Sequence, residues 1–189
     1  GCPQCSNQSS EPEIRILSEL KWFFDEVKHR YKLDGLEIDI FLPEFNIGIE
    51  YDGKYWHRDL ADIDLEKNQF MSSKGIHLVR VRQLPLKPLT ENDVMVGYSL
   101  EKKDLDEILR RIAPNVDITI KDKINTYLTQ PAFINNELFK IFREIKAIKN
   151  WTKINKKFRY KKIQLRSELL TSEGIQDLGE ALSIKFDNA

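Results

Sequence analysis

Four acidic side chains alternate along two neighbouring strand-like segments of the chain: Glu37 and Asp39 in the first, Glu50 and Asp52 in the second. If the two segments pair across the four-residue loop 43–46, Asp39 lies directly opposite Glu50 and Glu37 lies opposite Asp52. All four acids then share one face. Like charges in directly opposite positions are destabilising, on a scale of about 0.2–1 kcal/mol per pair. The pattern therefore predicts a compensating cation, and oxygen ligands suit Mg²⁺; a solvated polar face is the alternative.

Further residues could complete such a site. Glu19 lies at the edge of an apolar helical stripe and can face the same acids, although an exposed helical Glu fits the spacing equally well. His57 follows the second strand closely and could accept a proton from water, whereas a lone histidine is more often structural. Asp64 and Lys67, three residues apart, could orient His57 or a phosphate; a solvent-facing pair is the simpler interpretation.

The elements around these residues alternate between helix and strand, which predicts an α/β (α+β) fold. Residues 10–13 form a capping box, Ser-Glu-Pro-Glu, and apolar spacing extends the helix that it starts to about residue 30. Gly75 predicts the end of a later helix. The other expected elements are strands at 36–42, 47–52 and 76–82, and helices at 60–74, 102–112, 121–128 and 135–148.

Strand alternation also predicts how the sheet is packed. Leu36, Ile38, Ile40 and Leu42 recur at every second position, so we expect them to share one face. The helices before and after the two strands each have an apolar side that needs a sheet face to cover.

Composition sets the broad class of the protein. The chain has 189 residues, 41% hydrophobic and 32% charged, enough for one domain with an appendage. No apolar run approaches the ~20 residues of a membrane span, and the sequence does not open on the charged-then-apolar segment that is typical of a signal peptide. We expect an intracellular, cytoplasmic protein in a bacterial or phage context, without a membrane partner.

Charge is balanced overall but unevenly distributed. The 30 basic and 30 acidic residues divide into 16 and 21 over residues 1–112, and into 14 and 9 over residues 113–189. Residues 140–166 hold eleven basic residues and one acid, interleaved with aromatic residues. Such a segment predicts contact with a nucleic-acid backbone, with a solvated basic surface as the alternative. The predicted DNA-binding residues are Lys149, Lys153, Lys156, Lys157, Arg159, Lys161 and Lys162.

The only cysteines, Cys2 and Cys5, form a Cys-x-x-Cys pair that is half of a zinc site. No second pair follows, so two idle thiols or a disulfide is the simpler interpretation. We expect residues 1–9 to be the remnant of an upstream zinc ribbon, with Zn²⁺ bound only when the missing half is present.

Two segments resemble a known nuclease superfamily. Residues 37–43, Glu-Ile-Asp-Ile-Phe-Leu-Pro, and residues 49–57, Ile-Glu-Tyr-Asp-Gly-Lys-Tyr-Trp-His, are similar to motifs of the PD-(D/E)xK nucleases. Within that superfamily the chain most resembles the very-short-patch-repair endonucleases and related homing endonucleases, over residues 10–82.

The resemblance implies a restriction-endonuclease-like core with a small mixed sheet and helices on both faces, and we expect this domain over residues 10–112. The charge distribution and the helical segments predict a basic helical extension at 113–189. The resemblance also implies Mg²⁺ or Mn²⁺ bound by Asp39, Glu50 and the backbone carbonyl of Tyr51. His57 would activate water. The implied catalytic residues are Glu19, Asp39, Glu50, Asp52 and His57.

One position departs from the superfamily pattern. Asp52 stands where much of the superfamily has Lys, so a positive charge at the site has to come from Lys54, Lys67 or His57. The expected activity is metal-dependent hydrolysis of phosphodiester bonds in duplex DNA, of homing, nicking or restriction type. A catalytically inactive DNA-binding module and a protein-interaction domain with a basic tail are the alternatives. The sequence leaves the oligomeric state open.

Overall fold

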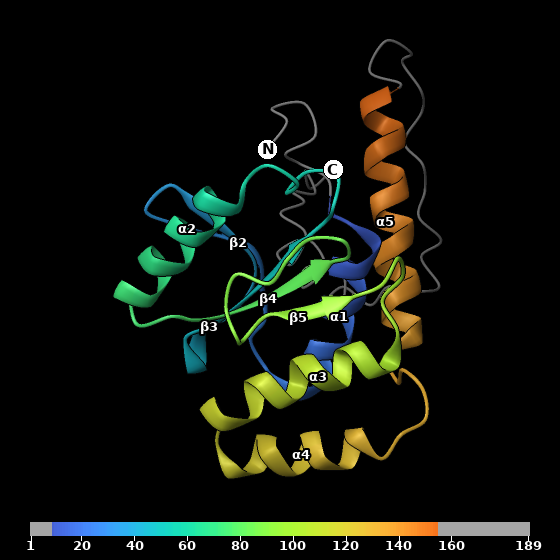
Figure 1. Cartoon of the computed structure of the whole chain (residues 1–189). Coiled ribbons are helices and arrows are strands. Elements are labelled where there is room, and N and C mark those ends of the chain that lie inside the picture. The colour runs from blue at the N-terminus through green and yellow to red at the C-terminus, as the bar shows by residue number, and fades with distance from the viewer. Residues whose placement is uncertain (1–8, 155–189) are drawn as a thin grey trace.

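A five-stranded mixed sheet forms the centre of the computed structural model, which describes residues 9–154 (Figure 1). The strands lie in the order β1-β2-β3-β4-β5; β2 pairs antiparallel with both β1 and β3, and β4 and β5 continue parallel to β3. Their bounds are Lys28–Leu33, Leu36–Leu42, Ile47–Asp52, His77–Gln83 and Val94–Val96. The predicted α+β class is confirmed.

Helices cover both faces of this sheet. They are α1 (Glu11–Phe23), α2 (Ala61–Ser73), α3 (Lys102–Ile112), α4 (Ile118–Leu128) and α5 (Asn136–Ile154). The large core lies between the sheet and α1, α3, α4 and α5, whereas α2 contributes to a smaller cluster on the opposite face (Figure 1). Because α4 and α5 add Ile124, Tyr127 and Phe142 to the large core, they pack as part of the same body as the sheet.

The first helix is shorter than its apolar spacing predicts. Its capping box is present, with the Ser10 hydroxyl accepting from the Glu13 N–H and the Glu13 carboxylate accepting from the Ser10 N–H. The helix ends at Phe23, and β1 occupies residues that were expected to be helical. Asp34 and Gly35, with φ of 49° and 86°, join β1 to β2, and an Asp-Gly turn of this kind favours a tight hairpin.

The β2–β3 hairpin has the predicted register as far as its pairing extends. Phe41 lies opposite Gly48 and Ile40 opposite Ile49, and the register ends there, before Asp39 and Glu50. The β1–β2 register is also interrupted at Asp39, where Arg30 would be the partner and has a left-handed φ of 56°. Asp39 is therefore a point of local distortion in the sheet.

This distortion changes which side chains share a face. Ile40 and Leu42 pack in the large core, but Ile38 packs with Phe41 in the cluster on the α2 side. The expectation that the four alternating residues from Leu36 to Leu42 share one face is therefore wrong.

Two parts of the chain lie outside the described residues. One is residues 1–8, which hold nearly all of the expected zinc-ribbon remnant. The other begins at residue 155 and includes most of the expected DNA-binding residues; the side chains of Lys149 and Lys153 are likewise not described. Within residues 9–154, no helix is long and apolar enough to cross a membrane.

Candidate active site

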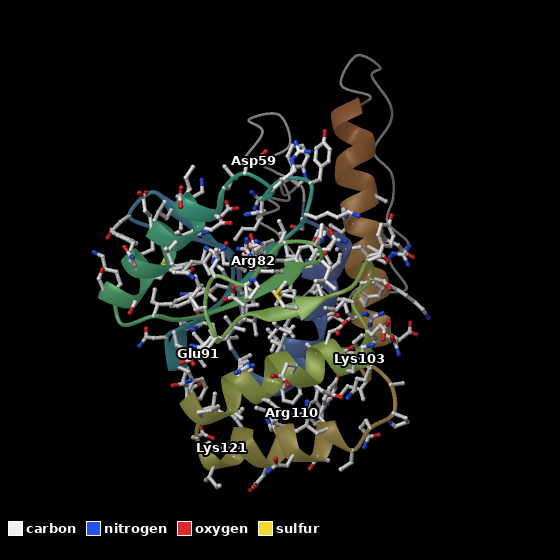
Figure 2. The ribbon with its side chains drawn as sticks, in the orientation of Figure 1. Asp59, Arg82, Glu91, Lys103, Arg110 and Lys121 are labelled. Carbon is white, nitrogen blue, oxygen red and sulfur yellow. The ribbon has the colours of Figure 1, made fainter. Side chains whose placement is uncertain are left out.

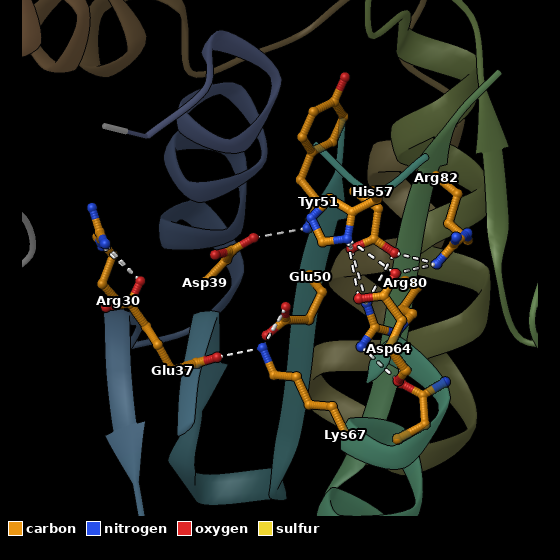
Figure 3. Close-up of polar contacts among 12 residues, drawn as sticks. Arg30, Glu37, Asp39, Glu50, Tyr51, His57, Asp64, Lys67, Arg80 and Arg82 are labelled. Carbon is orange, nitrogen blue, oxygen red and sulfur yellow. Dashed lines mark hydrogen bonds and ion pairs between the residues drawn. The ribbon is translucent and has the colours of Figure 1, made fainter. Parts of the chain in front are cut away.

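Asp39 occupies the place where β2 and β3 part. Its Oδ2 accepts a hydrogen bond from the backbone N–H of Tyr51 at 2.9 Å (Figure 3). The side-chain carboxylate therefore serves as the acceptor for this N–H at a point where β2 and β3 no longer pair. The pKa of Asp39 is raised well above its usual range, first by burial and then by the negative charges of Glu50 and Glu13. The charged form of Asp39 is thus unfavourable in this position.

Glu50 lies on the neighbouring strand with a side chain that is only 6% exposed. Its Oε2 accepts from the ammonium group of Lys67 at 2.7 Å, while its buried Oε1 has no hydrogen-bond partner among the described residues. Burial raises the pKa of Glu50 although Lys67 and Arg80 oppose this effect. One oxygen of a buried carboxylate is therefore left without a hydrogen-bond donor in the described part of the chain.

Lys67 reaches this pair from α2. Its Nζ contacts both the Glu50 carboxylate and the backbone carbonyl of Glu37 (Figure 3). Of the three residues that could replace the missing strand lysine, Lys67 is thus the one whose side chain contacts Glu50. The Glu37 carboxylate turns away from this contact and pairs with Arg30 at 2.7 Å.

Asp52 belongs to a separate buried network. Its side chain is 1% exposed, and both of its oxygens lie within 2.9 Å of Nη1 of Arg80. Nη1 of Arg82 lies 2.6 Å from Oδ2 of Asp52. In the parallel register Asp52 lies beside Arg82 and Glu50 beside Arg80, so two arginines of β4 face two acids of β3. The expectation that Glu37, Asp39, Glu50 and Asp52 share one face that needs a bound cation is therefore wrong for Glu37 and Asp52, because arginines pair with both.

His57 is attached to this network through one edge of its ring. Nδ1 lies 3.0 Å from Oδ2 of Asp64 and 3.5 Å from Oδ1 of Asp52. Burial raises the pKa of Asp64, but the hydrogen bond and charge of His57, together with Arg80 and Arg82, lower it more. The pKa of Asp64 therefore lies below its usual range. Asp64 is thus buried and paired with His57, not a solvent-facing residue.

The ligand atoms of Asp52, His57 and Asp64 lie within 4.8 Å of one another, so this group could hold a metal ion. Arg80 and Arg82 already supply two positive charges against the two aspartates. A cation at this group would have to compete with both guanidinium groups.

Glu19 does not join the acids of the hairpin. Its buried carboxylate accepts from the Tyr127 hydroxyl at 2.9 Å and from the backbone N–H groups of Ile134 and Asn135, so it holds the connection between α4 and α5. The acid of α1 whose charge acts on Asp39 is Glu13, which also lies 2.7 Å from Nε2 of His29. The expected position of Glu19 at the site is thus corrected to Glu13.

The residues missed by sequence reasoning are Glu13, Arg80 and Arg82. A signal for the arginines was present, because they alternate along a β-branched segment as the acids at 50 and 52 do. No comparable signal distinguished Glu13, whose role in the capping box explained it fully. No family model, curated protein or solved structure matches the chain, so its chemistry is inferred from these side chains.

Proposed function

We propose that the protein is an endonuclease that uses a divalent cation to hydrolyse phosphodiester bonds in DNA. The observation that carries the proposal is the unpartnered, buried Oε1 of Glu50 next to Asp39. A buried polar atom without a partner costs about 1–3 kcal/mol, and more when it is charged. A cation bound by both carboxylates removes this cost.

The charges at the pair support a cation. Asp39 and Glu50 carry two negative charges when ionised, and the ammonium group of Lys67 contacts only one oxygen of Glu50 at 2.7 Å. Mg²⁺ and Mn²⁺ prefer oxygen ligands, and Mg²⁺ typically takes one or two carboxylates and retains waters. The resemblance to PD-(D/E)xK nucleases points to the same two acids.

The Tyr51 backbone supplies a third oxygen. Because the N–H and C=O of a strand residue point to the same side of the strand, and the N–H of Tyr51 bonds to Asp39, the carbonyl is directed toward the gap between β2 and β3. Asp39, Glu50 and this carbonyl would hold the ion. Once bound, it would polarise the scissile phosphate and stabilise the charge that develops there.

The protein side chains then divide the remaining work. Lys67 supplies a fixed positive charge beside Glu50, in place of the lysine that Asp52 replaces in the strand. Asp64 binds Nδ1 of His57, which leaves Nε2 as the atom that can accept a proton from the attacking water. Arg80 and Arg82 form ion pairs with both oxygens of Asp52, so that acid does not act as an additional open ligand.

Cleavage of supercoiled plasmid with Mg²⁺ tests this proposal. We expect Asp39→Asn, which retains an oxygen for the Tyr51 N–H, and Glu50→Gln to abolish cleavage. The matched control is Asp62→Asn, which removes one exposed carboxylate of α2 and should cleave normally. DNA that is retarded but never cut by the unaltered protein would instead favour an inactive DNA-binding module, which the replacement of the strand lysine by Asp52 would explain.

A further inference from the structure

A cleft of about 570 Å³ opens beside His57. It lies between the connection that follows β3 and the loop that follows β4. Two kinds of side chain form its walls: cations, with Lys54, Arg58 and Lys87 at the rim, and apolar groups, with Pro85 and Leu86 among them.

The charged side chains that line the cleft are cationic. They are Lys54, Arg58, Arg82 and Lys87, beside His57, and no Asp or Glu lines the cleft among the residues that the structure describes. Arg82 is already paired with Asp52 and Asp64, so the charge open to a ligand comes from the other three. The positive charge of the cleft contrasts with the composition of residues 1–112, which contain 21 acidic and 16 basic residues. A cationic cleft on an acidic part of a chain attracts an anion locally, because nearby low-dielectric walls focus the field.

The rim cations are available to a ligand. Lys87 is exposed and has no acidic partner among the described residues, and the ammonium group of Lys54 lies 5.5 Å from the Tyr98 ring without a carboxylate partner there. Arg58 pairs with Asp59, but both side chains are more than three-quarters exposed. An exposed pair of this kind contributes little and can exchange its partner.

Two further observations point from the cleft toward the reacting groups. His57 lines the cleft while its Nδ1 is bound to Asp64, so the opposite edge of the ring is the one left for a ligand. Arg82 also lines the cleft, and its buried Nε–H has no acceptor among the described residues. The Arg82 N–H is a donor suited to a phosphate oxygen, whereas Nε2 of His57 stays available to accept a proton from water.

We propose that this cleft binds the phosphate backbone of the DNA strand next to the scissile bond; the inference rests on the proposed function. Glu50 and Asp52 are two positions apart on β3, a spacing of about 6.6 Å, and Asp52 lies 3.5 Å from His57. The cleft therefore begins close to the Asp39–Glu50 pair. Its apolar wall at Pro85 and Leu86 offers a surface for the sugar.

The salt dependence of DNA binding tests this inference. All measurements use the Asp39→Asn protein without divalent cation, so binding is scored whether or not the chain is a nuclease. Each phosphate contact contributes about 0.9 to the slope of log K against log salt for duplex DNA. Combining Lys54→Ala, Arg58→Ala and Lys87→Ala should reduce that slope by about 2.7. The ratio of the DNA affinity of the parent to that of the triple variant should therefore fall about 40-fold between 50 and 200 mM salt.

The matched control removes three cations elsewhere: Lys103, Arg110 and Lys121, each changed to Ala. Figure 2 shows these residues on α3 and α4, away from Arg82. The control should bind with an unchanged slope, and both triple variants should unfold at the temperature of the parent. Equal slopes for the cleft variant and its parent, or equal losses in the cleft variant and the control, would overturn the inference. If the inference about the cleft fails, the plasmid-cleavage experiment still tests the proposed function, because it does not depend on this cleft.

Discussion

Replacing Asp39 by Asn should separate two effects on folding stability: the destabilisation by the buried Asp39 charge and the stabilisation by a bound cation. The variant retains an oxygen to accept the Tyr51 N–H at 2.9 Å and removes the negative charge that opposes Glu50. Because burial and Glu50 raise the pKa of Asp39, its charged form is less favourable in the folded than in the unfolded protein. Without metal, we therefore expect the variant to be at least as stable as the parent at neutral pH.

A divalent cation should reverse this order. An ion at 100 times its dissociation constant stabilises the folded state by about 2.7 kcal/mol. For a chain of this size, 1 kcal/mol corresponds to about 2–4 °C in Tm, so Mn²⁺ should raise the Tm of the parent by about 5–11 °C. If the variant binds the ion a hundredfold more weakly, the same concentration contributes only about 0.4 kcal/mol, or about 1–2 °C.

The pH dependence of folding stability shows whether the Asp39 charge stabilises or destabilises the fold. A carboxylate with a raised folded pKa destabilises the folded state as pH rises from its unfolded pKa through the folded value. The metal-free parent should thus lose stability over that interval, and the gain from Mn²⁺ should grow over the same interval because the ion binds the charged form. Thermal unfolding with and without Mn²⁺, from about pH 4, near the ordinary pKa of Asp, upward to neutral pH, measures both trends. An equal Mn²⁺ response in the parent and in Asp39→Asn would refute the reasoning.

Substitutions at three other residues test individual assignments. Glu19→Ala should lower the free energy of unfolding in urea by about 3 kcal/mol or more, since it leaves buried donors without an acceptor, but the folded variant should still cleave DNA. Lys67→Met should lower the cleavage rate about 10²–10³-fold with DNA affinity retained, as expected for a lost electrostatic group; an unchanged rate would contradict its role. Asp64→Ala should lower the rate by up to the ~10²–10⁴ of a lost general base and change the pH–rate profile, whereas Asp64→Asn, which keeps an acceptor for His57, should recover part of the rate.

The fold was largely accessible from the sequence because its elements are locally encoded. The capping box at residues 10–13, the alternation at 47–52 and the register across the β2–β3 turn all correspond to features of the structure. The strand β1 was missed because its residues, Lys-His-Arg-Tyr-Lys-Leu, are mostly polar, as suits a strand at the edge of the sheet.

The candidate site was less accessible because tertiary contacts decide which acid meets which cation. Alternation treats a strand as regular, and it cannot reveal the distortion that directs Asp39 into the gap between strands. Asp52 pairs with arginine on β4 and Glu50 pairs with Lys67 on α2. Both partners come from elements that follow later in the chain. Glu19 satisfied the spacing expected of a site residue, but its partners come from α4 and from the connection between α4 and α5.

Anomalous diffraction from a crystal soaked in Mn²⁺ tests the central claim most directly. The account predicts a peak between Asp39 and Glu50, within reach of the Tyr51 carbonyl, and its loss in Asp39→Asn. A peak at the His57 group with Asp52 and Asp64, or no peak at either position at saturating Mn²⁺, would contradict it.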